Sequence, residues 1–164
     1  TMGIAQRLYQ EGLITYMRTD SIRLSDVAIK ASREYISENF SKAHLPSEAN
    51  LYGDSKNAQA AHEAIRPSGD KFITPEELLS RHKEESDEYK LYKLIFNTTV
   101  ASQMTDAKGI TKTIEIEVSK TDFSPLILSI SGTTWTFGGY RDLIKDATEK
   151  SQELPDLNEN DEIK

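Results

Sequence analysis

The sequence predicts an α+β fold, with a mainly helical domain over residues 1–104 and antiparallel strands within residues 105–164. Two observations indicate this division. Before residue 104, apolar residues recur every three or four positions in several segments, which is the period of a helix with one buried face. After residue 105, apolar and polar residues alternate, which is the period of a strand with one buried face. We therefore expect a helical domain followed by a partial β domain.

Two helices are predicted before residue 40. The first covers about residues 2–11 and ends at Gly12, a residue that readily takes the left-handed conformation found at helix ends. The second begins after Ser25, a favourable N-cap residue, and runs to about Asn39. Between them, residues 13–16 are β-prone and predict a short strand or an extended link.

Two more helices follow a loop over residues 41–70. The run Thr74-Pro75-Glu76-Glu77 is typical of a helix start, and it predicts a short helix over about residues 75–82. A core helix is predicted from about Asp87 to Met104. Its expected buried stripe consists of Leu91, Leu94, Ile95 and Thr98, with Tyr92, Phe96 and Val100 beside it.

Three strands are predicted in the β domain. Residues 110–118 and 126–131 are the first two, and a turn around residues 122–125 would join them as an antiparallel hairpin. A third, short strand is expected over residues 132–139, where the chain reaches a double glycine. Residues 140–145 predict a helical turn, and the acid-rich residues 149–162 predict a solvated linker.

Composition limits the classes of function. The formal net charge of −7 argues against a general binder of polyanions. Acidic and basic residues balance over residues 1–69, so any contact with nucleic acid is predicted there. The absence of cysteine excludes disulfides and thiolate metal sites and is compatible with the cytoplasm. No apolar run approaches the roughly 18 residues of a membrane span, so no membrane partner is expected.

The stretch over residues 12–21 carries the first candidate site. A tyrosine can act as a nucleophile, but its ordinary pKa of about 10 means that it needs help to lose its proton. A guanidinium nearby favours the phenolate and stabilises charge on an attacked phosphate, and Tyr16 and Arg18 meet this requirement. If the stretch is extended, Ile14, Tyr16, Arg18 and Asp20 share one face. The alternative is a strand tyrosine beside a surface ion pair.

The second candidate site lies in the loop over residues 41–70, whose length favours a functional segment. It contains the run His62-Glu63-Ala64-Ile65-Arg66-Pro67. His62 can carry a proton near neutral pH, and Arg66 adds a second group suited to phosphate. The alternative is a solvated histidine without a catalytic role. No metal site is expected, because His44, His62 and His82 lack the spacing of ligands.

Three blocks of the sequence resemble one known family. They are Ala5-Gln6-Arg7-Leu8-Tyr9, Gly12-Leu13-Ile14-Thr15-Tyr16-Met17-Arg18-Thr19-Asp20-Ser21 and the run from His62 to Pro67. Together they are similar to the central part of the type IA DNA topoisomerases, in the branch of bacterial topoisomerase I. Met17, and His62-Glu63 with Arg66, favour this branch over the topoisomerase III relatives. The similarity extends over essentially the whole chain.

The resemblance implies a role for each candidate residue. Tyr16 would attack a DNA phosphodiester and become linked to the 5′ phosphate, Arg18 would position that phosphate, and His62 would assist through the DNA backbone or by moving protons. Thr19, Asp20 and Arg66 would support the site or contact DNA. The implied cycle cleaves one strand, passes the other strand through the gap and rejoins the first, which relaxes negatively supercoiled DNA. The DNA would be single-stranded at the cleavage site.

The resemblance also implies parts that this sequence lacks. The acidic domain that binds Mg²⁺ in the family is outside the chain, so the fragment alone is expected to be inactive. Because the sequence starts at Thr1 and ends on Asp-Glu-Ile-Lys without a terminating pattern, we expect a piece of a larger protein that works with the other domains of its parent. The β domain would be one portion of an arch, with exposed sheet edges through which the fragment could dimerise. A cytoplasmic, bacterial enzyme is implied.

Two other functions stay open. A non-catalytic, DNA-binding helical module would use Tyr16 and Arg18 only to contact phosphate. An acidic protein-interaction domain would not involve nucleic acid. A covalent DNA adduct that depends on Tyr16 separates the enzyme from both.

Overall fold

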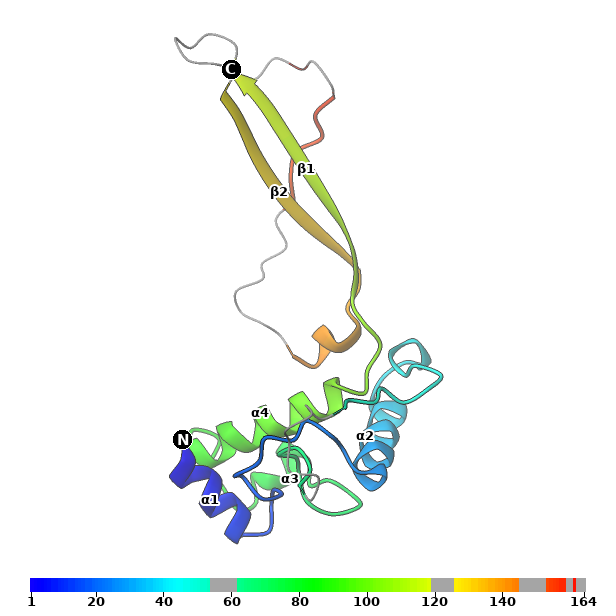
Figure 1. Cartoon of the computed structure of the whole chain (residues 1–164). Coiled ribbons are helices and arrows are strands. Elements are labelled where there is room, and N and C mark those ends of the chain that lie inside the picture. The colour runs from blue at the N-terminus through cyan, green and yellow to red at the C-terminus, as the bar shows by residue number, and fades with distance from the viewer. Residues whose placement is uncertain (54–61, 119–125, 145–152, 159–160, 162–164) are drawn as a thin grey trace. The chain divides into compact units, whose positions relative to one another are not determined.

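The computed structural model describes residues 1–53, 62–118, 126–144, 153–158 and 161 (Figure 1). The chain divides into two compact units. The helical unit comprises Thr1–Asp106 and Gly139–Ile144, and the β unit comprises Ala107–Gly138 and Lys145–Lys164. Helices and an antiparallel sheet both form, which confirms the predicted α+β class. The helical unit also includes the short segment at 139–144, which the sequence boundary had assigned to the β domain.

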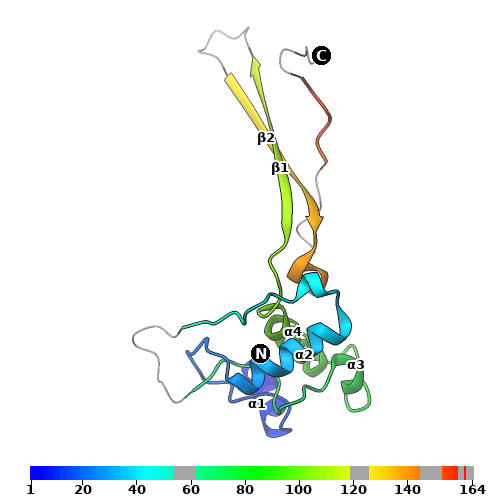
Figure 2. The ribbon, with the colours of Figure 1, turned by 90° about the vertical axis from the view of Figure 1, so that its right-hand side faces the viewer.

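The helical unit is organised around one long helix. Its α-helices are α1 (Met2–Gln10), α2 (Asp26–Asn39), α3 (Pro75–Leu78) and α4 (Asp87–Ala101), and its 3-10 helices are η1 (Lys42–His44) and η2 (Gly139–Asp142). As Figures 1 and 2 show, α4 runs beside the other α-helices, and it contacts each of them. The ring of Tyr35 from α2 meets the ring of Phe96 on α4 edge-on, with 5.0 Å between the centroids.

Helix α1 ends as the sequence predicts. Gly12 has a φ of 72°, in the left-handed region. The Gly12 amide donates to the carbonyl of Tyr9 at 3.0 Å, and the Leu13 amide donates to the carbonyl of Leu8 at 2.9 Å. These two bonds form a Schellman motif, in which the apolar residues three before and two after the cap pack together. Leu8 and Leu13 occupy those positions, and both are buried.

The buried face of α4 differs from the predicted one. Leu94 is 61% exposed, whereas Tyr89, Tyr92 and Phe96 are buried. Both faces carry apolar residues at helical spacing, and the aromatic face buries more area per side chain. The Tyr92 hydroxyl donates to the carbonyl of Ile73 at 2.6 Å, so its polar end is satisfied. Burial, with a smaller contribution from the Glu77 carboxylate, raises the pKa of Tyr92 and keeps this donor protonated.

Helix α3 begins at the predicted capping box. The Thr74 hydroxyl accepts from the Glu77 amide at 3.2 Å, and the Glu77 carboxylate accepts from the Thr74 amide at 2.8 Å. The helix is shorter than predicted and ends at Leu78. The chain then continues to His82 in turns, because the amides after Leu78 bond mainly to carbonyls three residues back.

The segment around η2 is held against the helical unit by specific contacts. The Tyr140 amide donates to the carbonyl of Thr105 at 3.0 Å, and the Nε2 atom of His44 lies 2.8 Å from the Asp142 carboxylate. Gly139 has a φ of 54°, and a Cβ atom there would lie 2.5 Å from the Thr105 carbonyl oxygen. Only glycine fits this approach.

The described residues of the β unit form an antiparallel pair of strands, β1 (Lys108–Val118) and β2 (Leu126–Phe137). Figure 2 shows them as a long twisted ribbon. Apolar side chains on both strands are exposed, among them Ile110, Ile127 and Leu128. Within the described residues each strand has a single partner, so the outer edge of each is unpaired, as the sequence led us to expect.

The predicted third strand is wrong. Residues 132–137 continue β2 without a break, and Gly132 pairs with Lys112 in the same register as its neighbours. In the sequence, Gly132 predicts the end of one strand and the start of another. The strand continues through it because cross-strand hydrogen bonds use the backbone and do not need a side chain. The expected turn at 122–125 lies outside the described residues, as does half of the expected linker over residues 149–162.

Replacing Gly12 with alanine should destabilise the protein. The left-handed φ of Gly12 strains any residue with a Cβ, at a cost of about 1 kcal/mol, although no atom would clash there. Gly3→Ala is the matched control, because Gly3 lies inside α1 with open space around it and should gain helix propensity. Denaturant unfolding of both variants checks this, and equal shifts of the two midpoints would contradict it.

Candidate active site

Both sequence motifs lie in the helical unit and contact each other. We call residues 13–21 the tyrosine segment and residues 62–68 the histidine segment. They meet in an isolated antiparallel bridge between Ile14 and Pro67. Residues far apart in the sequence are therefore neighbours at this site.

Tyr16 lies on the surface and is 39% exposed. The extended arrangement predicted for its segment does not form. Ile14 and Met17 are buried, whereas Tyr16 and Arg18 are exposed, so Ile14 does not share their face. The single bridge at Ile14 fixes only one residue pair, and the chain bends directly after it. The prediction of one common face with period two was wrong.

Hydrogen bonds from Thr15 hold the histidine segment in place. The Thr15 amide donates to the carbonyl of Arg66 at 2.9 Å, and the Arg66 amide donates to the Thr15 hydroxyl at 3.0 Å. The same hydroxyl donates to the carbonyl of Ala64 at 2.9 Å. The Ala64 amide in turn donates to the carbonyl of Arg23 at 2.8 Å. Thr15 thus binds the backbone of the histidine segment at both Ala64 and Arg66.

Two aromatic side chains flank the ring of Tyr16. The His62 ring stacks on it, with 5.7 Å between centroids and 30° between planes. The ring of Tyr9, from α1, meets it edge-on with centroids 5.5 Å apart. The nucleophile candidate therefore has an imidazole as its neighbour, the group that carries protons near neutral pH. The sequence placed Tyr9 on a helix and gave it no part in the site, because nothing local shows what its ring meets.

Arg18 and Asp20 are both exposed, and Thr19 is half-buried. The Thr19 hydroxyl accepts from the Ser21 amide at 3.1 Å, so it is engaged within its own segment. Within the described part of the chain, neither the Arg18 guanidinium nor the Asp20 carboxylate has a protein hydrogen bond or ion pair. Arg18 is therefore available to an anionic ligand.

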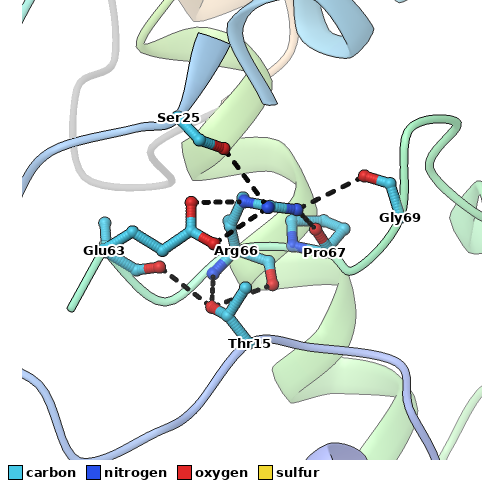
Figure 3. Close-up of polar contacts among 7 residues, drawn as sticks. Thr15, Ser25, Glu63, Arg66, Pro67 and Gly69 are labelled. Atoms are coloured by element: carbon cyan, nitrogen blue, oxygen red, sulfur yellow. Dashed lines mark hydrogen bonds and ion pairs between the residues drawn. The ribbon is translucent and has the colours of Figure 1, made fainter. Parts of the chain in front are cut away.

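Arg66 is buried, with only 8% of its surface exposed. Figure 3 shows its guanidinium turned into the protein, toward Glu63, Ser25 and the backbone of Pro67 and Gly69. The resemblance predicts that Arg66 supports the site or contacts DNA, and the structure gives its side chain protein acceptors, as a supporting residue would have. The residue type suggested phosphate, but a guanidinium serves equally well to join loops when carbonyls and a carboxylate surround it.

The Glu63 carboxylate accepts two hydrogen bonds from Arg66, from Nε at 3.0 Å and from Nη2 at 2.9 Å. Burial by itself raises the pKa of Glu63, but hydrogen bonds from Arg66 and Ser25 and the Arg66 charge outweigh this, and the pKa of Glu63 is lowered. Glu63 is therefore ionised at neutral pH, and its charge is balanced by Arg66.

Ser25 takes a different role from the predicted one. It stands at the N-cap of α2 but makes no side-chain cap bond there. Its hydroxyl accepts instead from Arg66 Nη2 at 3.3 Å. A serine before a helix gives the same sequence signal in both cases, so only the tertiary contact distinguishes them.

The described residues contain no group of three or more histidine, cysteine or acidic side chains placed to hold a metal ion. Glu63 is occupied by Arg66, and Asp20 has no second carboxylate grouped with it. In the same part of the chain, no helix has the length and apolar character needed to span a membrane.

Comparisons with known proteins agree with the resemblance of the three sequence blocks. A family model described as DNA topoisomerase matches residues 1–164. DNA topoisomerase 1 of Streptomyces coelicolor is 46% identical over 158 residues, which cover 95% of this chain and 16% of the relative. DNA topoisomerase 1 of Mycolicibacterium smegmatis is 48% identical over 141 residues, which cover 85% of this chain and 15% of the relative.

A solved structure is also similar. Full-length topoisomerase I from Thermotoga maritima, in a monoclinic crystal form, matches with a TM-score of 0.68 and 32% identity, covering 95% of this chain and 25% of that one. The chain thus spans about a sixth of the curated relatives and a quarter of the solved one.

The Glu63–Arg66 pair should make stability depend on pH. A carboxyl whose folded pKa is lowered stabilises the fold above its unfolded value of 4.5, and this contribution is lost as the pH falls through the folded pKa. Glu63→Gln should therefore flatten the loss of unfolding free energy on acidification below pH 4.5. Glu48→Gln, at an exposed carboxylate without an ion pair in the described structure, is the control. Equal acid sensitivity of Glu63→Gln and the unmodified protein would contradict the prediction.

Proposed function

The chain belongs to the DNA topoisomerase I family, and on this premise we propose that it supplies the nucleophilic tyrosine of a longer type IA enzyme. The observation that carries the proposal is the exposed Tyr16 ring stacked on His62, with the exposed Arg18 in the same segment. A nucleophile, a proton carrier and a phosphate-binding cation are the groups that phosphoryl transfer to a tyrosine needs.

In the proposed reaction the Tyr16 oxygen attacks the phosphorus of a DNA phosphodiester. The phenol loses its proton, a bond forms between the tyrosine oxygen and phosphorus, and the bond from phosphorus to the 3′ oxygen breaks. The 3′ oxygen takes up a proton and leaves as a hydroxyl, while the 5′ phosphate stays on Tyr16. Religation is the reverse attack by the 3′ hydroxyl, after the other strand has passed through the gap.

Four neighbours have proposed supporting roles. Arg18 holds the scissile phosphate, and its lack of a described protein partner supports this role. His62 contacts the DNA backbone or moves the proton, which its stacking on Tyr16 supports. Thr19 and Asp20 lie in the same segment and act as supporting or DNA-contact residues. The substrate is DNA that is single-stranded at the cleavage site, and the net result is relaxation of negative supercoils in the cytoplasm.

Mg²⁺ has no suitable site among the described residues, because no three potential ligands are grouped there. We propose, from the family resemblance, that another part of the longer enzyme binds the metal, and none of the steps above passes through it. For the same reason we expect no relaxation by the isolated chain. The edges of β1 and β2 that have no partner strand among the described residues would then pair with other parts of the longer protein, or with a second copy in the isolated fragment.

Tyr16→Phe should abolish the covalent adduct. Removing the phenolic oxygen removes the only atom that forms the bond to phosphorus, while the ring contacts remain. The measurement is a denaturing gel of the intact protein with labelled single-stranded DNA and Mg²⁺. Tyr140→Phe is the matched control, because Tyr140 is also 39% exposed and lies in the helical unit, and its adduct should persist. An adduct that survives Tyr16→Phe overturns the assignment, and no adduct in the unmodified protein favours a DNA-binding module.

Arg18→Ala should weaken binding of single-stranded DNA about tenfold, since a charge-assisted hydrogen bond to phosphate is lost. The slope of log affinity against log salt should fall by about 0.7, which is one phosphate contact on a single strand. Arg81→Ala removes the same charge from another exposed position in the helical unit and is the control. Titrations at several salt concentrations measure both quantities. Identical behaviour of the two variants would count against a phosphate role for Arg18.

A further inference from the structure

The Arg66 side chain has no donor left for DNA. A guanidinium carries five N–H groups. Nε donates to Glu63, Nη2 donates to Glu63 and Ser25, and Nη1 donates to the carbonyls of Pro67 and Gly69 at 2.7 and 3.4 Å (Figure 3). All five donors are therefore engaged within the protein. Binding a phosphate would require breaking one of these bonds in a buried place.

The charge of Arg66 is also balanced. The Glu63 carboxylate makes a bidentate pair with it, and the lowered pKa of Glu63 keeps that carboxylate ionised at neutral pH. A pair of this kind, with Arg66 buried and Glu63 partly exposed, presents no net charge to a polyanion. Lysine could not replace the arginine, because an ammonium group lacks the planar fork that reaches Glu63, Ser25 and two carbonyls together.

The same pair lies directly beside His62 in the chain. Glu63 follows His62 in the sequence, and Arg66, three residues further on, donates to the Glu63 carboxylate. The backbone of Arg66 and the carbonyl of Ala64 are fixed by Thr15, which precedes Tyr16. Each of the two aromatic rings is thus adjacent in sequence to a residue of one hydrogen-bonded cluster.

From this geometry we propose that Arg66, Glu63 and Thr15 form a clamp that holds the His62 ring against Tyr16. Arg66 is then a positioning residue, and it contacts neither the DNA nor the reacting atoms. The proposal rests on the proposed roles of Tyr16 and His62. It deepens them by naming what sets the distance between the two rings.

Arg66→Lys tests the clamp in the intact protein with single-stranded DNA and Mg²⁺. The rate of adduct formation at saturating DNA should fall about tenfold, because small displacements of a catalytic group cost large factors in rate. The dissociation constant for DNA and its salt slope should stay unchanged. Arg81→Lys, at an exposed arginine, is the control for the exchange itself. A salt slope that falls by about 0.7 would make Arg66 a phosphate contact and overturn the proposal.

A double substitution with His62→Ala separates positioning from general structural damage. If Arg66 acts through His62, Arg66→Lys should slow a His62→Ala protein by less than about twofold, because the group that it positions is already gone. Independent losses that multiply would show that Arg66 acts elsewhere, and the clamp would be rejected.

Thr15 gives a second test if Arg66→Lys does not fold. Thr15→Val keeps the shape but removes the hydroxyl that bonds Ala64 and Arg66, and it should slow adduct formation about tenfold. Thr15→Ser restores the hydroxyl and should recover most of the rate. Equal rates for the two variants would overturn the clamp.

The two proposals fail in different ways. An adduct that persists in Tyr16→Phe removes the proposed function itself. If Tyr16→Phe abolishes the adduct and His62→Ala slows its formation, but Arg66→Lys and Thr15→Val keep the full rate, only the clamp is rejected.

Discussion

The site depends on the pairing of two segments that are about fifty residues apart in the chain. The Thr15 amide donates to the carbonyl of Arg66, and the Ser68 amide donates to the carbonyl of Leu13, each at 2.9 Å. Pro67 lies at the centre of this bridge and has no amide hydrogen, so its neighbours make the bonds. Without this pairing, the distance and angle between the Tyr16 and His62 rings would not be fixed.

Buried side chains of the hydrophobic core anchor the pairing of the tyrosine and histidine segments. The Schellman motif at Gly12 directs the chain from α1 into Leu13 and Ile14, and both of these side chains are buried. A side-chain hydrogen bond also joins α1 to α4, in which Arg7 Nε donates to the Glu88 carboxylate at 2.8 Å. Because packed interiors deform little, a buried anchor one residue before Thr15 gives the exposed Tyr16 a defined position.

The site contains two arginines with opposite environments. Arg66 is buried and paired with Glu63, whereas Arg18 is exposed and has no pair within the described residues. The first arginine stabilises the loop, and the second is free to bind an anion. The proposed phosphate contact at Arg18 is compatible with a net charge of −7, because residues 1–69, which include Arg18, carry as many basic as acidic groups.

The sequence by itself determined the features that depend on neighbouring residues. Gly12 ends α1 and Thr74 begins α3, because each signal involves backbone groups within a few positions. The change of period near residue 105 gave the α+β class, and three short blocks gave the family. Only the tertiary structure decided which face of α4 is buried, that β2 continues through Gly132, and that Arg66 turns inward. Those outcomes depend on contacts between distant parts of the chain, such as Thr15 with Arg66, and such contacts leave no periodic pattern along the sequence.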